Sequence, residues 1–157
     1  MLSLISFDNV LKLFVIDKFN KAKGWKCQDF EELKENINFG QREERIEANE
    51  IINSLRICDP AVGSGHFLVS ALNELIAIKS ELGVLQDRQP QPKRIREYDI
   101  RVEYDELVVA DEDGDVFKYD PSNPSSQRIQ ETLFEEKRTI IENCLFGVDL
   151  NPKSVEI

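Results

Sequence analysis

The stretch ICDPAVGSGHFLVSAL, residues 57–72, decides how the rest of the chain is interpreted. A short apolar run ends in Asp59-Pro60, a loop follows with two glycines, and a helical pattern begins after the loop. A short apolar run bounded by a turn is typical of a buried parallel strand. The sequence therefore predicts a strand, a glycine loop and a helix in immediate succession. Cys58, inside the run, is expected to be a buried strand thiol.

The helix after the loop has the clearest periodicity in the chain. Its apolar residues recur at helical spacing: Phe67, Leu68, Ala71, Leu72, Leu75 and Ile76. Gly83 is placed to end the helix. We expect Phe67 and Leu68 to be primarily core residues rather than residues with a functional role.

Residues 1–54 predict an N-terminal helical segment of three amphipathic helices. Asp8 is placed to cap the first helix, which closes near Gly24, and Asp29 to cap a short second one. The third is expected near residues 42–54, with isoleucines on one side and the charged run REER on the other.

The segment at about 84–124 is predicted to be an insertion. A polar, proline-bearing loop leads into short strand patterns over 98–119, with a turn at 111–114, which indicate a β-hairpin. Acidic residues far outnumber basic ones there, so we expect the hairpin to face solvent. A helix with Ile129, Leu133, Ile140 and Ile141 on one stripe follows, and CLFGVDL (144–150) then predicts a second buried strand.

Two apolar strands joined by a helix-bearing crossover form a βαβ unit with a parallel sheet. The expected fold class is therefore α/β, a partial Rossmann-like sheet with N-terminal helices and an inserted β-hairpin. The 157 residues, 41% of them hydrophobic, suit a chain with one substantial core.

The formal net charge of −10 argues against an electrostatic clamp for nucleic acid, because an acidic surface repels phosphates. Three scattered cysteines without a CxxC pair are typical of reduced thiols in an intracellular protein, and no metal site is predicted. No stretch approaches the roughly 20 apolar residues of a membrane span. The expected location is the cytoplasm.

The glycine loop lies where ligands bind in doubly wound sheets, beyond the carboxyl ends of the strands. Gly63 and Gly65 let backbone approach a ligand, and the helix start behind them favours negative charge. A dinucleotide fingerprint would need a third glycine at position 68, which is Leu68, and no GxxxxGK[ST] occurs. A Rossmann dehydrogenase is therefore the weakest option.

The string DPAVGSGHFL followed by LFGVDLNPKSVEI resembles two cofactor motifs of S-adenosylmethionine-dependent DNA methyltransferases. More narrowly, it resembles the adenine-N6-modifying enzymes of the type IIS/IIG restriction–modification group, as do the insertion and the helix after it. The resemblance runs from about residue 50 to the last residue. It implies S-adenosylmethionine as cofactor and double-stranded DNA as substrate, bound through parts of the parent protein outside this chain.

The resemblance implies a cofactor-binding set: Asp59, Pro60, Ala61, Gly63, Gly65, Phe67, Asp149 and Leu150. Asp59 and the loop backbone would hold the methionine end. Asp149 would bind the ribose, because one carboxylate can accept hydrogen bonds from both hydroxyls. Residues 55–157 would then form an incomplete methyltransferase domain. The plain alternatives, a tight turn at the glycines and a helix cap at Asp149, stay open.

The family's catalytic string, Asn-Pro-Pro-aromatic, does not occur in this sequence. In such enzymes it hydrogen-bonds the amine of a flipped adenine and stacks on the base. The Asn123-Pro124 and Asn151-Pro152 pairs do not continue with proline and an aromatic residue. No catalytic residue is assigned, and His66 is expected to be a loop-and-cap residue.

We expect the chain to be the N-terminal cofactor-binding portion of a larger enzyme, inactive alone and with at most weak cofactor affinity. Finding Asn-Pro-Pro-Tyr or Asn-Pro-Pro-Phe within about a hundred residues after Ile157, the scale of one domain, would largely settle the reaction. Two alternatives stay open: a methyltransferase fragment acting on protein or RNA, and a degenerate, non-catalytic interaction domain. In the latter, the acidic hairpin at 98–119 would be the partner surface.

Overall fold

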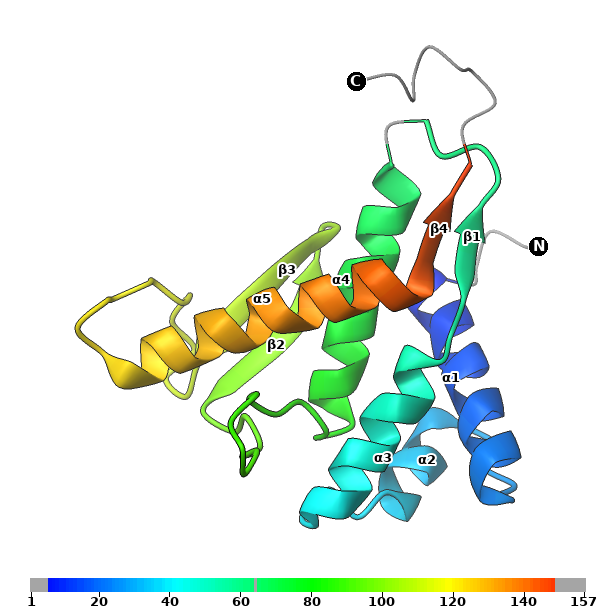
Figure 1. Cartoon of the computed structure of the whole chain (residues 1–157), viewed down its shortest axis with the longest axis horizontal. Coiled ribbons are helices and arrows are strands. Elements are labelled where there is room, and N and C mark those ends of the chain that lie inside the picture. Colours follow the sequence, from blue (N-terminus) through cyan, green and yellow to red (C-terminus); the bar gives the residue numbers. More distant parts are fainter. Residues whose placement is uncertain (1–5, 64, 149–157) are drawn as a thin grey trace.

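The computed structural model describes residues 6–63 and 65–148, and Figure 1 shows their arrangement. The helices are α1 (Phe7–Lys23), α2 (Phe30–Asn36), α3 (Arg42–Asn53), α4 (His66–Glu81) and α5 (Pro124–Cys144); the strands are β1 (Ile57–Asp59), β2 (Tyr98–Glu103), β3 (Glu106–Asp111) and β4 (Leu145–Gly147). This order confirms an α/β chain with N-terminal helices and an inserted hairpin. Within the described ranges, no helix is both long and apolar enough to cross a membrane.

The three N-terminal helices begin and end close to the predicted residues. Asp29 caps α2, its Oδ1 accepting a hydrogen bond of 2.8 Å from the backbone N of Glu32. Gly24 ends α1 in the left-handed conformation, at φ 71°. The prediction that Asp8 caps α1 is wrong, because the helix begins after Ser6. Asp8 lies in the first turn, where its charge still favours the helix N-terminus.

The sequence predicts the charged run REER at the start of α3 on the solvent face, but one of its residues lies inside the protein. Arg45 is buried, donating to the side chain of Gln86 at 2.9 Å and to the carbonyl oxygen of Phe39 at 2.8 Å. Ile46, expected on the apolar side, is 38% exposed, whereas Ile52 is buried. The helix therefore packs with a face rotated from the predicted one, because the guanidinium finds enough acceptors inside.

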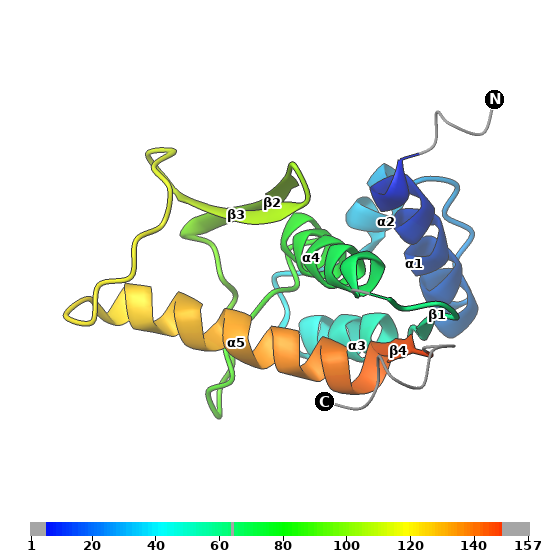
Figure 2. The same ribbon diagram turned by 90° about the horizontal axis from the view of Figure 1, so that it is seen from above.

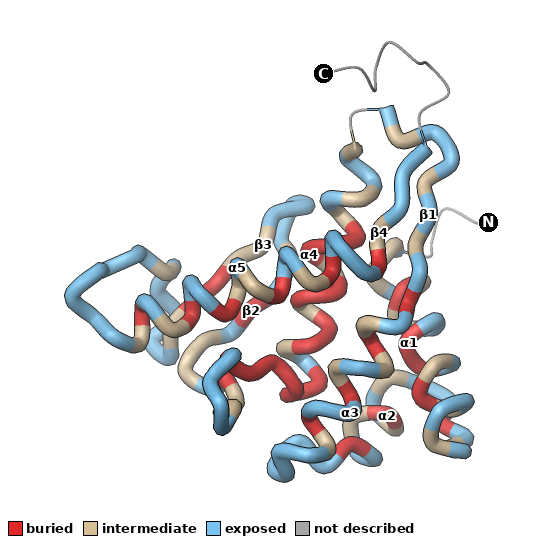
Figure 3. The backbone as a smooth tube through the Cα atoms, viewed as in Figure 1, coloured by how far each residue is buried: buried red, intermediate tan, exposed pale blue. Residues whose placement is uncertain are grey.

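Helix α4 is the centre of the fold. Figure 2 shows it between the hairpin β2–β3 and the pair α1–α2, with α3 and α5 along another side. Ala71, Leu75 and Ile76 are fully buried, and Gly83, at φ 75°, follows the helix end as predicted. Figure 3 shows buried residues along most of α4 and exposed ones near its start. The expectation that Phe67 belongs to the core is wrong: it is 42% exposed, in the first turn.

Strands β1 and β4 form the predicted parallel pair, with Cα partners Ile57–Leu145, Cys58–Phe146 and Asp59–Gly147. The expectation that both strands are buried is wrong. Ile57 and Leu145 pack against the core, whereas the alternate residues Cys58 and Phe146 are exposed. Successive side chains of a strand point to opposite faces, and only one face of this sheet is covered by described residues.

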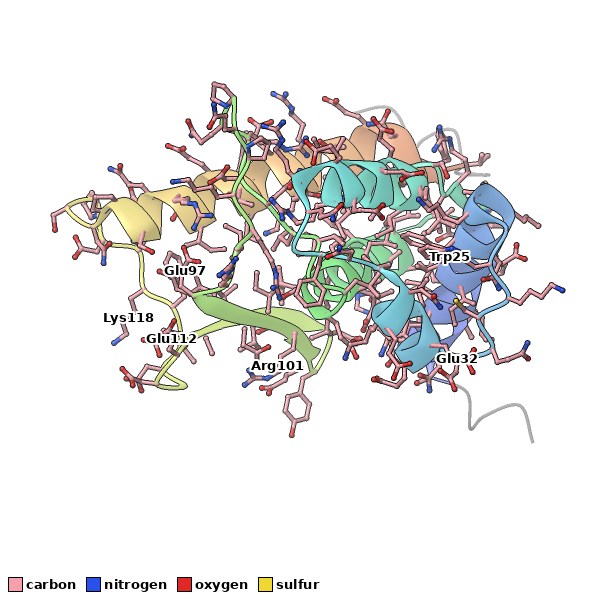
Figure 4. All side chains as sticks on the ribbon, turned by 90° about the horizontal axis from the view of Figure 1, so that it is seen from below. Trp25, Glu32, Glu97, Arg101, Glu112 and Lys118 are labelled. Carbon is pink, nitrogen blue, oxygen red and sulfur yellow. The ribbon has the colours of Figure 1, made fainter. Side chains whose placement is uncertain are left out.

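The inserted hairpin pairs β2 with β3 in antiparallel register. Its tight turn is Tyr104-Asp105, both with positive φ, which is the geometry of a type I′ turn. The prediction of a solvent-facing hairpin holds for one face only, because Ile100 and Val109 are buried. On the other face Arg101 pairs with Asp99 and Glu103; Figure 4 shows Arg101 toward one end of the hairpin, with Glu97 and Glu112 toward the other.

Helix α5 connects the hairpin to β4. Asn123 caps it by accepting hydrogen bonds from the backbone of Ser125 and Ser126, and Pro124 takes the first turn. This Asn-Pro pair is thus a helix start. Ile129 and Ile140 are buried as predicted, but Ile141 is 52% exposed because it lies one step off the buried stripe.

Candidate functional site

The glycine loop connects the end of β1 to the start of α4. Figure 1 shows β1 and β4 side by side, with the loop at their carboxyl ends. In parallel sheets this is the edge where ligands bind. The structure therefore brings the described members of the predicted set, Asp59 to Phe67, to the edge that the sequence indicated.

Backbone hydrogen bonds tie the loop to the end of β4. The amide of Val148 donates to the carbonyl oxygen of Asp59, and the amide of Val62 donates to the carbonyl oxygen of Val148, both at 3.0 Å. The loop thus continues the strand pairing beyond the last pair of β1 and β4. Asp149 and Leu150 lie outside the described residues, directly after Val148 in the sequence.

Asp59 holds the first turn of the loop. Its Oδ1 accepts a hydrogen bond of 3.0 Å from the backbone N of Ala61, a local bond typical of aspartate in turns. Asp59 is half-buried, while Pro60 and Ala61 are exposed. A side chain fixed in this way at a strand end is already ordered before a ligand binds.

Gly63 and Gly65 take left-handed conformations, with φ of 50° and 78°. Among the described residues, a Cβ on Gly65 would meet nothing within 4 Å, so its φ rather than crowding explains the glycine. The amide of Gly65 donates to the carbonyl oxygen of Val62 at 2.8 Å and closes the turn. The loop backbone is therefore constrained, while no described residue occupies the position of a side chain at Gly65.

The start of α4 offers backbone donors to the same edge. The first helical bond runs from the amide of Val69 to the carbonyl oxygen of Gly65, and within the described residues no side chain caps this end. Amides of a first helical turn have no partner inside the helix, and they carry the positive end of its dipole. Such a turn suits a carboxylate or another anion.

Phe67 and His66 begin α4, and each contacts a different neighbour. The Phe67 ring packs on Phe7 of α1, with the ring centroids 5.1 Å apart. The exposed His66 has its Nε2 3.8 Å from a carboxylate oxygen of Asp105, at the hairpin turn. Asp105 also accepts, through its backbone oxygen, a bond of 3.1 Å from Asn73. The hairpin turn therefore lies along the first two turns of α4.

A cavity of about 590 Å³ lies elsewhere, between α1, α4 and β2. Its lining includes the carboxylates of Asp8, Glu74, Glu81, Asp99 and Asp105. Burial, together with the charges of Asp8 and Asp105, raises the pKa of Glu74. An excess of carboxylates does not suit a nucleic-acid backbone. The glycine loop, with its backbone donors, is the better candidate for an anionic group.

Sequence reasoning missed Gly147, the last residue of β4. A Cβ there would lie 2.8 Å from Cγ2 of Val62, closer than side chains tolerate. The available signal was a glycine at a strand end, directly before the motif's acidic residue. Gly147 therefore belongs to the packing that supports the loop.

The chain is 32% identical, over 160 aligned residues, to a protein of Methanocaldococcus jannaschii named "Putative type II restriction enzyme and methyltransferase". The alignment takes in 95% of this chain but 10% of that protein, so the chain spans a small part of its relative. No protein-family profile matches the chain. No solved structure matches it either.

Proposed function

We propose that the chain is the cofactor-binding portion of a DNA methyltransferase of a restriction–modification system. The observation that carries the proposal is the glycine loop at the carboxyl ends of two parallel strands, in a chain similar to a named restriction enzyme and methyltransferase. Two separate lines of support agree on this class: the motif resemblance and the relative's name. The cofactor-binding unit is residues 55–157, as predicted from the sequence.

S-adenosylmethionine fits the loop on chemical grounds. The cofactor carries a carboxylate and no phosphate, so it needs backbone donors and open space rather than a cluster of cations. Within the described residues, Gly65, where a Cβ would meet nothing within 4 Å, and the start of α4, which no side chain caps, supply both. When bound, the cofactor supplies an activated methyl group.

The residues of the chain would bind and orient the cofactor. Asp59 and the amides near Ala61, Gly63 and Gly65 would hold the methionine end, with Pro60 and Phe67 beside them. Asp149 would accept hydrogen bonds from the ribose hydroxyls, next to Leu150. Val148, the residue before Asp149 in the sequence, is hydrogen-bonded to both Asp59 and Val62, which supports this assignment.

Adenine N6 is the proposed methyl acceptor, in a specific site of double-stranded DNA. This finer proposal depends on the motif resemblance, because the relative's name does not give the methylated base. The acceptor base would be bound by parts of the protein other than this chain. Since restriction–modification enzymes act on cellular DNA, the proposed location is the cytoplasm.

Cofactor binding is tested by titrating the chain with S-adenosylmethionine. We expect weak, saturable binding that Asp149→Ala abolishes. Asp113→Ala removes the same charge in the turn that follows β3, far along the chain from the loop, and is the matched control. Tight binding would contradict the expectation of weak affinity. Equal titrations for wild type and Asp149→Ala would favour the non-catalytic interaction domain.

The methylated base is tested with the full reading frame that encodes this chain, expressed in a host without DNA methylation. We expect N6-methyladenine in the host DNA, detected by mass spectrometry of its nucleosides. Methylated cytosine instead would contradict the adenine assignment. Methylation confined to RNA or protein would support the alternative methyltransferase class.

A further inference from the structure

Gly147 lies so close to the glycine loop that a side chain at this position would overlap Val62. A Cβ at this position would lie 2.8 Å from Cγ2 and 3.0 Å from Cβ of Val62, and 3.1 Å from Cδ1 of Leu68. Gly147 is not among the glycines with positive φ, so its backbone suits any residue. The position therefore depends on the missing side chain rather than on conformational freedom.

The two neighbours would respond differently to a larger residue. Leu68 presents the end of a flexible side chain, which can change rotamer. Val62 cannot escape in this way, because its Cβ, which is attached directly to the backbone, is itself only 3.0 Å away. Relief requires movement of the Val62 backbone or of Gly147.

The loop is the less firmly held partner. Gly147 lies in β4, which is in register with β1 over three residue pairs and continues without a break from the 21-residue helix α5. Val62 lies in an exposed turn, tied by its amide to Val148 and by the bond of its carbonyl oxygen with Gly65. The strain of a side chain at position 147 would therefore fall on loop 60–65.

We propose that Gly147 is a positioning residue for cofactor binding. Its bare α-carbon lets Val62 pack on the end of β4, and this contact sets where the loop amides stand relative to the start of α4. The inference rests on the proposed function, because it assigns the loop amides to the methionine end of S-adenosylmethionine. It adds a residue outside the predicted cofactor-binding set.

The test combines two measurements on the ¹⁵N-labelled chain. Amide hydrogen exchange of Val62 and Gly65 reports the loop without any ligand, and titration with S-adenosylmethionine reports affinity. For Gly147→Ala we expect exchange at these amides to speed up about tenfold and affinity to fall about tenfold, as for other overpacked contacts. Amides within α4, such as that of Leu75, should keep their protection.

Shortening Val62 provides the rescue. Val62→Ala removes the methyl group that a Cβ at position 147 would meet at 2.8 Å and leaves the closer-than-usual approach of 3.0 Å to its own Cβ. The double variant with Gly147→Ala should therefore recover part of the lost affinity and bind at least about threefold more tightly than Gly147→Ala alone. Gly40→Ala is the control: it also lacks a positive φ, and its Cβ would meet only the flexible side chain of Asn38, at 3.3 Å. It should change neither measurement.

Each outcome decides the proposal. Unchanged amide exchange in Gly147→Ala would overturn the proposed role of Gly147. Faster exchange with unchanged affinity for S-adenosylmethionine would also overturn it. Neither result contradicts the proposed function. Failure of the double variant to recover part of the lost affinity would also overturn the proposed role of Gly147. If Gly147→Ala does not fold by circular dichroism, Val62→Ile enlarges the same contact from the loop side and should weaken binding. A wild-type chain that does not bind S-adenosylmethionine would overturn the proposed function, and this inference with it.

Discussion

The two ends of α4 differ in how they are held. Its carboxyl-terminal half is fixed by buried charge: Nζ of Lys79 lies 2.6 Å from a carboxylate oxygen of Glu136 on α5, with both side chains almost wholly buried. Its amino-terminal end follows an exposed loop supported by backbone bonds and two left-handed glycines. One end of α4 is thus packed against α5 through a buried ion pair, and the other end follows the exposed glycine loop. This arrangement suits a binding loop on a fixed scaffold.

The buried pair Lys79–Glu136 has further hydrogen-bond partners. Lys79 also donates to the side-chain oxygen of Asn53, and Arg88 donates to the second oxygen of Glu136. Burial lowers the pKa of Lys79, and the charge of Glu136 acts against this shift. A buried ion pair is tolerated only when its hydrogen bonds are satisfied, and Asn53 and Arg88 supply them here.

The largest expected effect comes from breaking the buried Lys79–Glu136 pair. Glu136→Ala leaves Lys79 buried without its partner and should lower the free energy of unfolding by about 3–5 kcal/mol, measured by urea denaturation. Glu135→Ala, which removes a surface pair with Arg138, should cost less than about 0.5 kcal/mol. Replacing both charges, Lys79→Met with Glu136→Leu, should restore most of the stability. Equal losses for Glu136→Ala and Glu135→Ala would contradict the claim that the buried pair holds the carboxyl-terminal half of α4.

A second variant addresses the open end. Gly65→Ala forces a side chain into φ 78° and should cost about 1 kcal/mol or more in stability, with loss of cofactor binding. Gly24→Ala is the matched control, because Gly24 has φ 71° and a Cβ there also meets nothing within 4 Å. Both variants should lose similar stability, and only Gly65→Ala should lose binding. Parallel loss of binding in both would show that stability alone explains the effect.

The smallest effect concerns Glu74, in the middle of α4. Its raised pKa in the folded chain means that folding favours the protonated form, so this contribution to stability is present at acid pH and is lost as pH rises through the folded pKa. Glu74→Gln should therefore stabilise the chain at pH 7, by at most about 0.5 kcal/mol, and less at pH 4. Thermal unfolding at the two pH values measures this. A larger gain at pH 4 would contradict the assigned sign.

Local signals predicted much of the fold. The Asp29 cap, the glycines after α1 and α4, and the parallel pairing of the two apolar runs depend on neighbouring residues or on known connection rules. The position of the glycine loop at the strand ends follows from the same rules. For the cap and the two glycines, the cause lies in the neighbouring residues, whereas the pairing of Ile57 with Leu145 follows from the connection rule for strands far apart in the sequence.

Long-range partners account for what sequence reasoning missed. Lys79 and Glu136 are 57 positions apart, and Arg45 meets Gln86 across 41. Nothing local distinguishes these charges from solvated ones. The helical stripe predicts Phe67 in the core, but the stripe does not show that the first turn of α4 extends beyond the core. The importance of Gly147 follows from its contact with Val62, which the sequence does not show.

The most direct measurement of the central claim is a map of amide chemical shifts in the ¹⁵N-labelled chain during titration with S-adenosylmethionine. We predict saturable shifts at Ala61, Gly63, Gly65 and the residues that follow β4, with little change around Lys79. Shifts confined to the acidic cavity between α1 and β2, or no saturable shift at any concentration, would contradict cofactor binding at the glycine loop.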